Sequence, residues 1–304
     1  MKKNSTLLIV LTIISLSIAL VSVTYAWIAR RFKPTIEEDN MKIQASSALQ
    51  IVYDSNSQTS SASLKTFLPT LTDRFEFKQV SSNNGINFFG FDTSGDKPKV
   101  VGVPSAQSPT NDDYLNAGII HFSFRLAPRD NLGTGSLYVL LAHNECGFSL
   151  SGDHTPTTEV TYQTAFRCSI SYTISDVTTT IIFANDTTKI YYQDIGSPIA
   201  LNNNAVNQYI DDIGADGKLD FVNDDSTFYT SPTVVNFNSK AKSDATDTLT
   251  STDKANALCV LTGNQAVQFT VNIWLEGCDP NTLTSINSNY IDFLLKFDAI
   301  LEED

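Results

Sequence analysis

The sequence predicts an all-β protein: a jelly-roll-like antiparallel β-sandwich with long loop insertions, preceded by an N-terminal hydrophobic leader helix. Three observations favour this class. The chain is rich in Thr, Ser, Asn, Asp, Val, Ile, Phe and Tyr, which prefer strands and turns to helices. Four segments alternate apolar and polar residues with the period of a strand that has one buried face. Ten or more candidate strands suit a jelly roll.

The chain opens on the leader. Lys2 and Lys3 precede an uncharged run over residues 4–29, and Arg30 and Arg31 follow it. The run is longer than the ~7 to 15 apolar residues of a secretory peptide and reaches the ~20 residues that span a bilayer as a helix. A cleaved export signal and a retained membrane anchor are therefore both open.

The end of the leader carries a signal-peptidase pattern. Small residues at Thr24 and Ala26 occupy the minus-three and minus-one positions, which predicts cleavage between Ala26 and Trp27. In the alternative, the segment stays in the membrane with Tyr25 and Trp27 at the interface. Cleavage would release a secreted or cell-surface protein, and the membrane would be contacted only through the leader.

Candidate strands follow in order after an N-terminal extended segment, residues 27–48. The four with clear alternation are residues 120–126, 168–174, 267–275 and 291–297. Shorter candidates are residues 49–53, 75–80, 87–91, 99–103, 137–141, 179–183, 190–192, 234–237 and 257–261. Segments with little apolar spacing predict loops at residues 55–63, 106–113 and 238–254, and residues 205–212 predict a short helix. No repeat or linker divides residues 49–304, which we expect to form a single sandwich domain.

The charge balance disfavours nucleic acid as a partner. The whole chain carries a net charge of −13, and removal of residues 1–26 would leave 18 basic against 33 acidic side chains, or −15. An acidic surface repels phosphate, and the basic residues are scattered rather than clustered. We therefore expect self-association or other surface proteins as partners, and no nucleic acid.

Four cysteines follow the leader, an even number that predicts disulfides in an exported protein. Three connectivities are open. Cys146 and Cys278 each adjoin a glycine at the end of a strand-like run, whereas Cys168 and Cys259 lie inside such runs. Because the two cysteines of each kind lie at similar positions in their strands, we expect Cys146 to pair with Cys278 and Cys168 to pair with Cys259.

One acidic segment matches part of a calcium loop. Asp212, Asp216, Gly217 and Asp220 fall at the first, fifth, sixth and ninth positions of a twelve-residue EF-hand loop. The third position is Gly214, which offers no side-chain ligand, and the twelfth is an asparagine, which cannot bind in bidentate fashion. The segment is either a calcium site or an acidic turn, and no other cofactor is expected.

No catalytic motif stands out. His121, His143 and His154 are isolated, with none of the spacing of a zinc site, and we expect His121 to face solvent. Ser136 follows a glycine-rich turn and lacks the nucleophile-elbow spacing. The sequence therefore predicts a non-enzymatic protein, although two carboxylates would suffice for a secreted hydrolase.

Three segments together resemble a known group. Residues 21–27 (Val-Ser-Val-Thr-Tyr-Ala-Trp) end the leader, residues 41–45 (Met-Lys-Ile-Gln-Ala) follow it, and residues 272–280 form a strand and turn near the other end. This pattern resembles the TasA and camelysin group of exported proteins in Gram-positive bacteria. The resemblance implies a jelly-roll sandwich released by a dedicated signal peptidase, with subunits that polymerise into surface or biofilm-matrix fibres. In fibre-forming members the freed N-terminal segment, here residues 27–51, adds as a strand to the next subunit.

The residues of this segment leave its role open. Charges and Pro34 interrupt the part before residue 40, so residues 41–53 make the better donor strand, and they also suit a first strand of the monomer. The leading hypothesis is a non-enzymatic secreted structural protein of the cell surface or biofilm matrix, joined by donor-strand addition. The alternative is a membrane-tethered binding module, in which Tyr191, Tyr192 and Tyr209 stack on carbohydrate.

Overall fold

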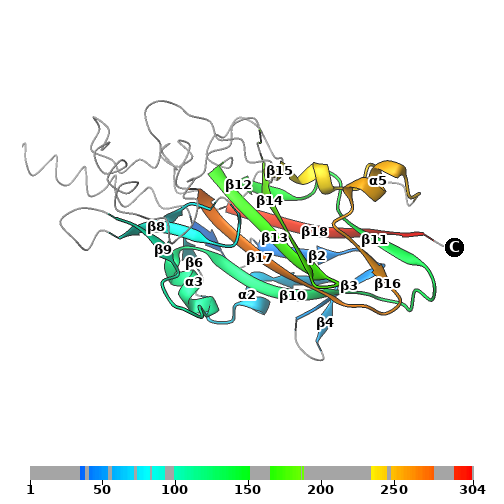
Figure 1. The fold of residues 1–304 in the computed structure, drawn as a ribbon, viewed down its shortest axis with the longest axis horizontal. Helices are drawn as coiled ribbons and strands as arrows, with labels where there is room; N and C mark the ends of the chain where they lie inside the picture. Colours follow the sequence, from blue (N-terminus) through cyan, green and yellow to red (C-terminus); the bar gives the residue numbers. More distant parts are fainter. Residues whose placement is uncertain are drawn as a thin grey trace, which may run out of the picture.

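Two facing β-sheets form the body of the protein in a computed structural model (Figure 1). The structure describes residues 35–37, 41–53, 57–71, 74–82, 84–92, 99–150, 165–185, 187, 234–244, 248–276 and 291–302. The leader and its predicted helix lie outside these residues. The elements are β1 (Thr35–Glu37), β2 (Met41–Ala45), β3 (Leu49–Val52), β4 (Gln58–Thr59), β5 (Ser61–Ser63), α2 (Leu64–Phe67), β6 (Arg74–Glu76), β7 (Gln79–Val80), β8 (Phe88–Asp92), β9 (Lys99–Val103), α3 (Asn111–Ala117), β10 (Ile120–Pro128), β11 (Ser136–Leu141), β12 (Gly147–Leu150), β13 (Phe166–Ile174), β14 (Val177–Ala184), β15 (Val234–Asn236), η4 (Phe237–Lys240), α5 (Ser251–Asn256), β16 (Cys259–Thr262), β17 (Val267–Glu276) and β18 (Ile291–Glu302).

The sheet order confirms the predicted β-sandwich. Among the described residues, the larger sheet has eight strands in the order β15-β14-β13-β17-β10-β3-β4, with β7 beside β17. The smaller has six, in the order β16-β11-β18-β2-β5, with β12 beside β18. The sheets are mixed rather than purely antiparallel, because β2 runs parallel to β18, β15 to β14 and β7 to β17. Long stretches of chain separate the two strands of each pair, so no tight hairpin sets their direction.

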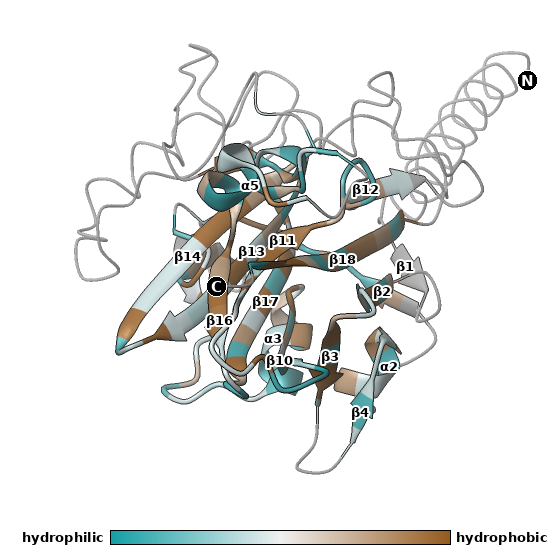
Figure 2. Cartoon of the chain, turned by 90° about the vertical axis from the view of Figure 1, so that its right-hand side faces the viewer, coloured by the Kyte–Doolittle hydropathy of each residue, from teal (hydrophilic) through white to brown (hydrophobic). Residues whose placement is uncertain are grey.

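Alternation along the four long strands builds the core between the sheets. In β10, Phe122 and Phe124 are buried while Ser123 between them is exposed. The rings of Phe124, Phe269 and Phe297 meet with centroids 5.5–5.9 Å apart, which links strands of both sheets. Such aromatic pairs contribute about 0.5–1.5 kcal/mol each beyond the area they bury. Figure 2 shows the hydrophobic colour on β3, β11 and β18 and a largely hydrophilic α5.

A second layer covers one end of the larger sheet on its outer face. Figure 1 shows α3, β8 and β9 together at this end, opposite the end where β18 terminates. A small separate core forms beneath them from Val80, Phe88, Ile119, Ile182 and Trp274. This part of the sheet is therefore buried on both faces.

The three predicted loops contain short elements, so that prediction was wrong in part. Residues 55–63 include β4 and β5, α3 begins within residues 106–113, and residues 238–254 include most of η4 and part of α5. Helices α3 and α5 each start at a capping box, from Thr110 to Asp113 and from Thr250 to Asp253. Such caps specify helices too short to show apolar periodicity. The helix predicted at residues 205–212 lies outside the described residues. Among the helices that are described, none has the length and apolar character needed to cross a membrane.

Candidate functional site

Strand β2, the second strand of the chain as described, lies within the smaller sheet of its own chain. It pairs in parallel with β18, where Ile43 is opposite Leu295, and antiparallel with β5, where Lys42 is opposite Ser63. Met41 and Ile43 are buried at 0% and 1% exposure, and Lys42 between them is exposed. The sandwich thus takes in β2, upstream of the boundary predicted at residue 49. Within a single chain, residues 41–45 act as a strand of the monomer.

The chain crosses from one sheet to the other directly after β2. Residues 46–48 connect β2 in the smaller sheet to β3 in the larger one, and Ser46 N donates to Phe297 O at 2.9 Å. Three residues therefore separate β2, a strand of the smaller sheet, from β3, a strand of the larger sheet. A hinge of this length is typical of elements that can exchange between identical chains.

The opposite margin of the fold is formed by the hairpin β13–β14 (Figure 2). Ser175 and Asp176 make its two-residue turn with positive φ values of 49° and 63°, as a type I′ turn requires. The short strand β15 pairs with β14 only at Ile182 to Ala184. Within the described part of the chain, no strand lies beside residues 177–181 on that side of β14.

Hydroxyl groups pair across the outer face of the larger sheet next to this edge. Ser171 Oγ and Thr180 Oγ1 lie 2.8 Å apart, and Thr173 and Thr178 make an equivalent contact at 2.9 Å. Their strands are in register, Ser171 opposite Thr180 and Thr173 opposite Thr178. This part of the face is therefore polar, and none of the four side chains is charged.

A buried polar row lies beneath the second layer on the same face. His121 Nδ1 donates to Asn272 Oδ1 at 2.6 Å, and Asn272 Nδ2 donates to Ser169 Oγ and Gly85 O at 3.1 and 3.0 Å. Ser169, fully buried, donates to Gly85 O at 2.6 Å. The serine proton is thus already bonded to a carbonyl, so this row is a structural network rather than a nucleophile with its base.

The prediction that His121 faces solvent was wrong. Its ring stacks on Tyr114 of α3 with centroids 4.0 Å apart and planes 14° apart. Burial lowers the pKa of His121, and the hydrogen bond with Asn272 opposes this shift only in part. Alternation assigned His121 to the outer face correctly, but the second layer covers that face.

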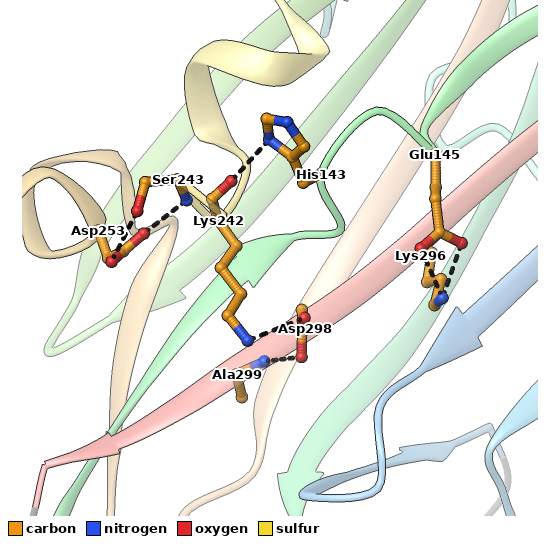
Figure 3. A network of polar contacts seen from close by, with 8 residues as sticks. All are labelled: His143, Glu145, Lys242, Ser243, Asp253, Lys296, Asp298 and Ala299. Atoms are coloured by element: carbon orange, nitrogen blue, oxygen red, sulfur yellow. Dashed lines mark hydrogen bonds and ion pairs between the residues drawn. The ribbon is translucent and has the colours of Figure 1, made fainter. Parts of the chain in front are cut away.

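A third polar network holds the segment before β16 against the smaller sheet (Figure 3). Lys242, only 4% exposed, points its Nζ toward Asp298 Oδ2 on β18 at 3.7 Å. His143 Nδ1 donates to Lys242 O at 2.9 Å. Ser243 N and Oγ donate to Asp253 Oδ1 and Oδ2 at 2.7 and 3.1 Å. These contacts fix the position of η4 and α5 on the sheet.

The cysteines do not follow the predicted pairing where the structure describes them. Cys146, Cys168 and Cys259 are free thiols, so the structure lacks the predicted bond between Cys168 and Cys259. These two lie on β13 and β16, in different sheets. Facing sheets pack about 10 Å apart, whereas a disulfide requires Cα atoms within about 7 Å. Cys278 lies outside the described residues, and Cys146, its predicted partner, is a free thiol in the structure.

Several other predicted residues also lie outside the described ranges: Ala26, Trp27, Asp212, Asp216, Asp220, Tyr191, Tyr192 and Tyr209. The calcium and cleavage predictions therefore remain predictions. Within the described residues, no group of three or more His, Cys, Asp or Glu side chains could hold a metal ion.

An open pocket of about 450 Å³ lies at the end of the sandwich near the terminus of β18. Asp130, Asn131 and Thr134 from the loop after β10 supply its polar lining. Leu137 and Leu301 supply part of its apolar lining, and Leu301 is 42% exposed. Sequence reasoning did not single out these residues, because only the fold brings the loop and the C-terminal strand together.

Comparison with protein families, with curated proteins and with solved structures finds no match to this chain.

Proposed function

We propose that the protein is a non-enzymatic structural component of a Gram-positive cell surface or biofilm matrix, secreted through its leader and able to self-assemble. Subunits would join by exchange of the N-terminal strand. The observation that supports this proposal is the placement of β2, a strand close to the N-terminus that follows β1 and fills a place between β18 and β5.

The geometry of β2 suits exchange because no tight turn joins it to either partner: β18 lies at the other end of the chain, and β3 and β4 come between β2 and β5. Its parallel pairing with β18 depends on no local turn, and the antiparallel pairing with β5 spans a separate connection. A second copy of β2 could therefore make the same backbone bonds and insert the same two anchors, Met41 and Ile43. Opening the hinge at residues 46–48 would free the strand for this purpose.

A cysteine pair across β2 and β5 tests the exchange. Lys42 and Ser63 are directly opposite, so their Cβ atoms lie within about 5.5 Å, a separation that a small shift closes to disulfide distance. In the Lys42→Cys/Ser63→Cys variant, oxidation of assembled protein should give a ladder of covalent oligomers on a denaturing, non-reducing gel. The single variant Lys42→Cys is the matched control. A purely intrachain bond in assembled protein would refute strand exchange.

A second candidate function is carbohydrate binding by a surface module. The pocket of about 450 Å³ favours it, since Asp130, Asn131 and Thr134 place carboxylate, amide and hydroxyl groups around an apolar floor. A glycan array with the purified protein tests this candidate. Binding that Asp130→Ala abolishes, in protein that sediments as a monomer, would favour the binding module over the structural role.

A further inference from the structure

We propose that residues 177–181 of β14 pair with the same residues of a second copy about a two-fold axis. This contact would join two eight-stranded sheets edge to edge. The inference rests on the proposed self-association, but it concerns a different surface from the strand exchange, at the other margin of the fold.

The hairpin geometry determines which backbone groups point away from β13. In a two-residue hairpin the flanking residues Ile174 and Val177 form the hydrogen-bonded pair, and bonded positions then alternate along the strand. The even-numbered residues of β14 therefore direct N–H and C=O outward. This agrees with β15, which pairs with β14 over Ile182 to Ala184. Thr178 and Thr180 keep the same outward direction with no strand beside them among the described residues.

A two-fold axis through Thr179 brings these groups together. Antiparallel self-pairing sets Thr178 of the first copy opposite Thr180 of the second, and the two-fold axis sets Thr180 of the first copy opposite Thr178 of the second. Four backbone hydrogen bonds follow, two from each pair. Val177 then lies opposite Ile181 of the second copy. The sequence Val-Thr-Thr-Thr-Ile reads almost identically in both directions, so like residues meet like throughout the contact.

The chemistry of the edge favours a second copy over a charged partner. The chain carries a net charge of −13, yet residues 177–181 include no charged side chain. Natural edge strands usually carry a charge, a proline or a bulge that prevents such pairing, and the five residues have neither a charge nor a proline. Asp176, the nearest carboxylate, lies in the turn beyond the paired segment. Val177 is 66% exposed and would be covered by the contact.

The contact is small, so the expected association is weak. Five paired residues bury less area than a stable interface, which needs about 1,200 Å², and interfaces below this size are typical of weak, transient association. A two-fold contact closes at two subunits and cannot build a fibre alone. Between fibres built by strand exchange it would act as a lateral link, where many weak contacts act together.

Paired charges at positions 178 and 180 test the register. In Thr178→Lys/Thr180→Lys, lysines oppose lysines across the axis, and dimerisation of the purified protein by sedimentation velocity should weaken at least tenfold. Thr178→Glu/Thr180→Glu should dissociate in the same way. An equimolar mixture of the two variants should regain a dimer, because every lysine then faces a glutamate. Ser123→Lys, on the same outer face but on β10, is the control and should leave the dimer unchanged.

Other outcomes separate the two proposals. If the wild-type protein associates and the lysine variant associates equally well, the edge contact is refuted while self-assembly stands. A wild-type protein that stays monomeric at 500 μM and forms no filaments refutes both. A lysine variant that lowers the melting temperature without changing sedimentation would show that the edge is covered within its own chain, which also overturns the inference.

Discussion

Replacing Asp253 with asparagine would remove one buried carboxylate that ties α5 to the segment before it. Asp253 is 1% exposed and accepts hydrogen bonds from Ser243 N and Oγ and from Thr250 N and Oγ, at 2.5–3.1 Å. Oδ2 accepts three of these bonds and Oδ1 accepts only the one from Ser243 N. Asparagine has the same shape but only one acceptor oxygen; with this oxygen at the Oδ2 position, Ser243 N would face an NH₂ group. Bonds to a charged group contribute about 1.5–3 kcal/mol each. Because the variant loses the bond from Ser243 N and keeps the other three to a neutral oxygen, we expect the free energy of unfolding to fall by about 1.5–3 kcal/mol.

The effect should depend on pH in a defined direction. Burial opposes ionisation of Asp253, but hydrogen bonds from Thr250 and Ser243 outweigh it and lower the pKa from 3.8 to about 2. Since the folded pKa is the lower one, the ionised carboxylate stabilises the fold fully above about pH 4. This part is lost as the pH falls from 4 to 2. One pKa unit corresponds to about 1.4 kcal/mol, so after a reduction for solvent screening the pH-dependent part of the stability amounts to about 1–2 kcal/mol.

Urea unfolding followed by the fluorescence of buried Trp274 measures both effects. The matched control is Asp113→Asn, which removes the same capping box from α3 at an exposed position and should cost less. The difference in the free energy of unfolding between wild type and Asp253→Asn should shrink as the pH falls from 4 to 2. A difference that stays constant over this range would refute the charge as its cause.

Two further predictions follow from packing. Burial raises the pKa of Cys146 to about 11 and of Cys259 to about 12. At pH 8 both thiols should therefore resist alkylation in the folded protein and react fully in urea. Rapid alkylation of either thiol in the folded protein would contradict this prediction. Gly118 has φ +86° and a Cβ there would lie 2.5 Å from Lys78 N, whereas Gly133, at φ +61°, has no atom within 4 Å. Gly133→Ala should therefore cost about 1 kcal/mol and Gly118→Ala clearly more by urea unfolding, and equal losses would show that the Lys78 contact does not matter.

The sequence predicted the strands that have one buried face. Residues 120–126, 168–174, 267–275 and 291–297 all lie within β10, β13, β17 and β18, because apolar alternation marks the face of each strand that points into the sandwich. The outer face of β13 and β17 is buried in part as well, beneath the second layer. It could not predict the parallel partners of these strands. Pairing of β2 with β18 joins residues some 250 positions apart, and no local pattern encodes that choice.

The candidate surfaces were harder to predict than the strands. The open edge of β14 has a local signal in the uncharged, nearly symmetric run at residues 177–181, but whether a strand covers it depends on how far β15 extends. The predicted pairing of Cys168 with Cys259 failed for the same reason. Their positions inside strands were evident, whereas their assignment to different sheets depended on the whole topology.

The most direct test of the proposed role combines N-terminal sequencing with negative-stain electron microscopy of the protein purified from its own cell. We expect a chain that starts at Trp27 and forms filaments. An intact leader with isolated particles would contradict it and favour a membrane-tethered binding module.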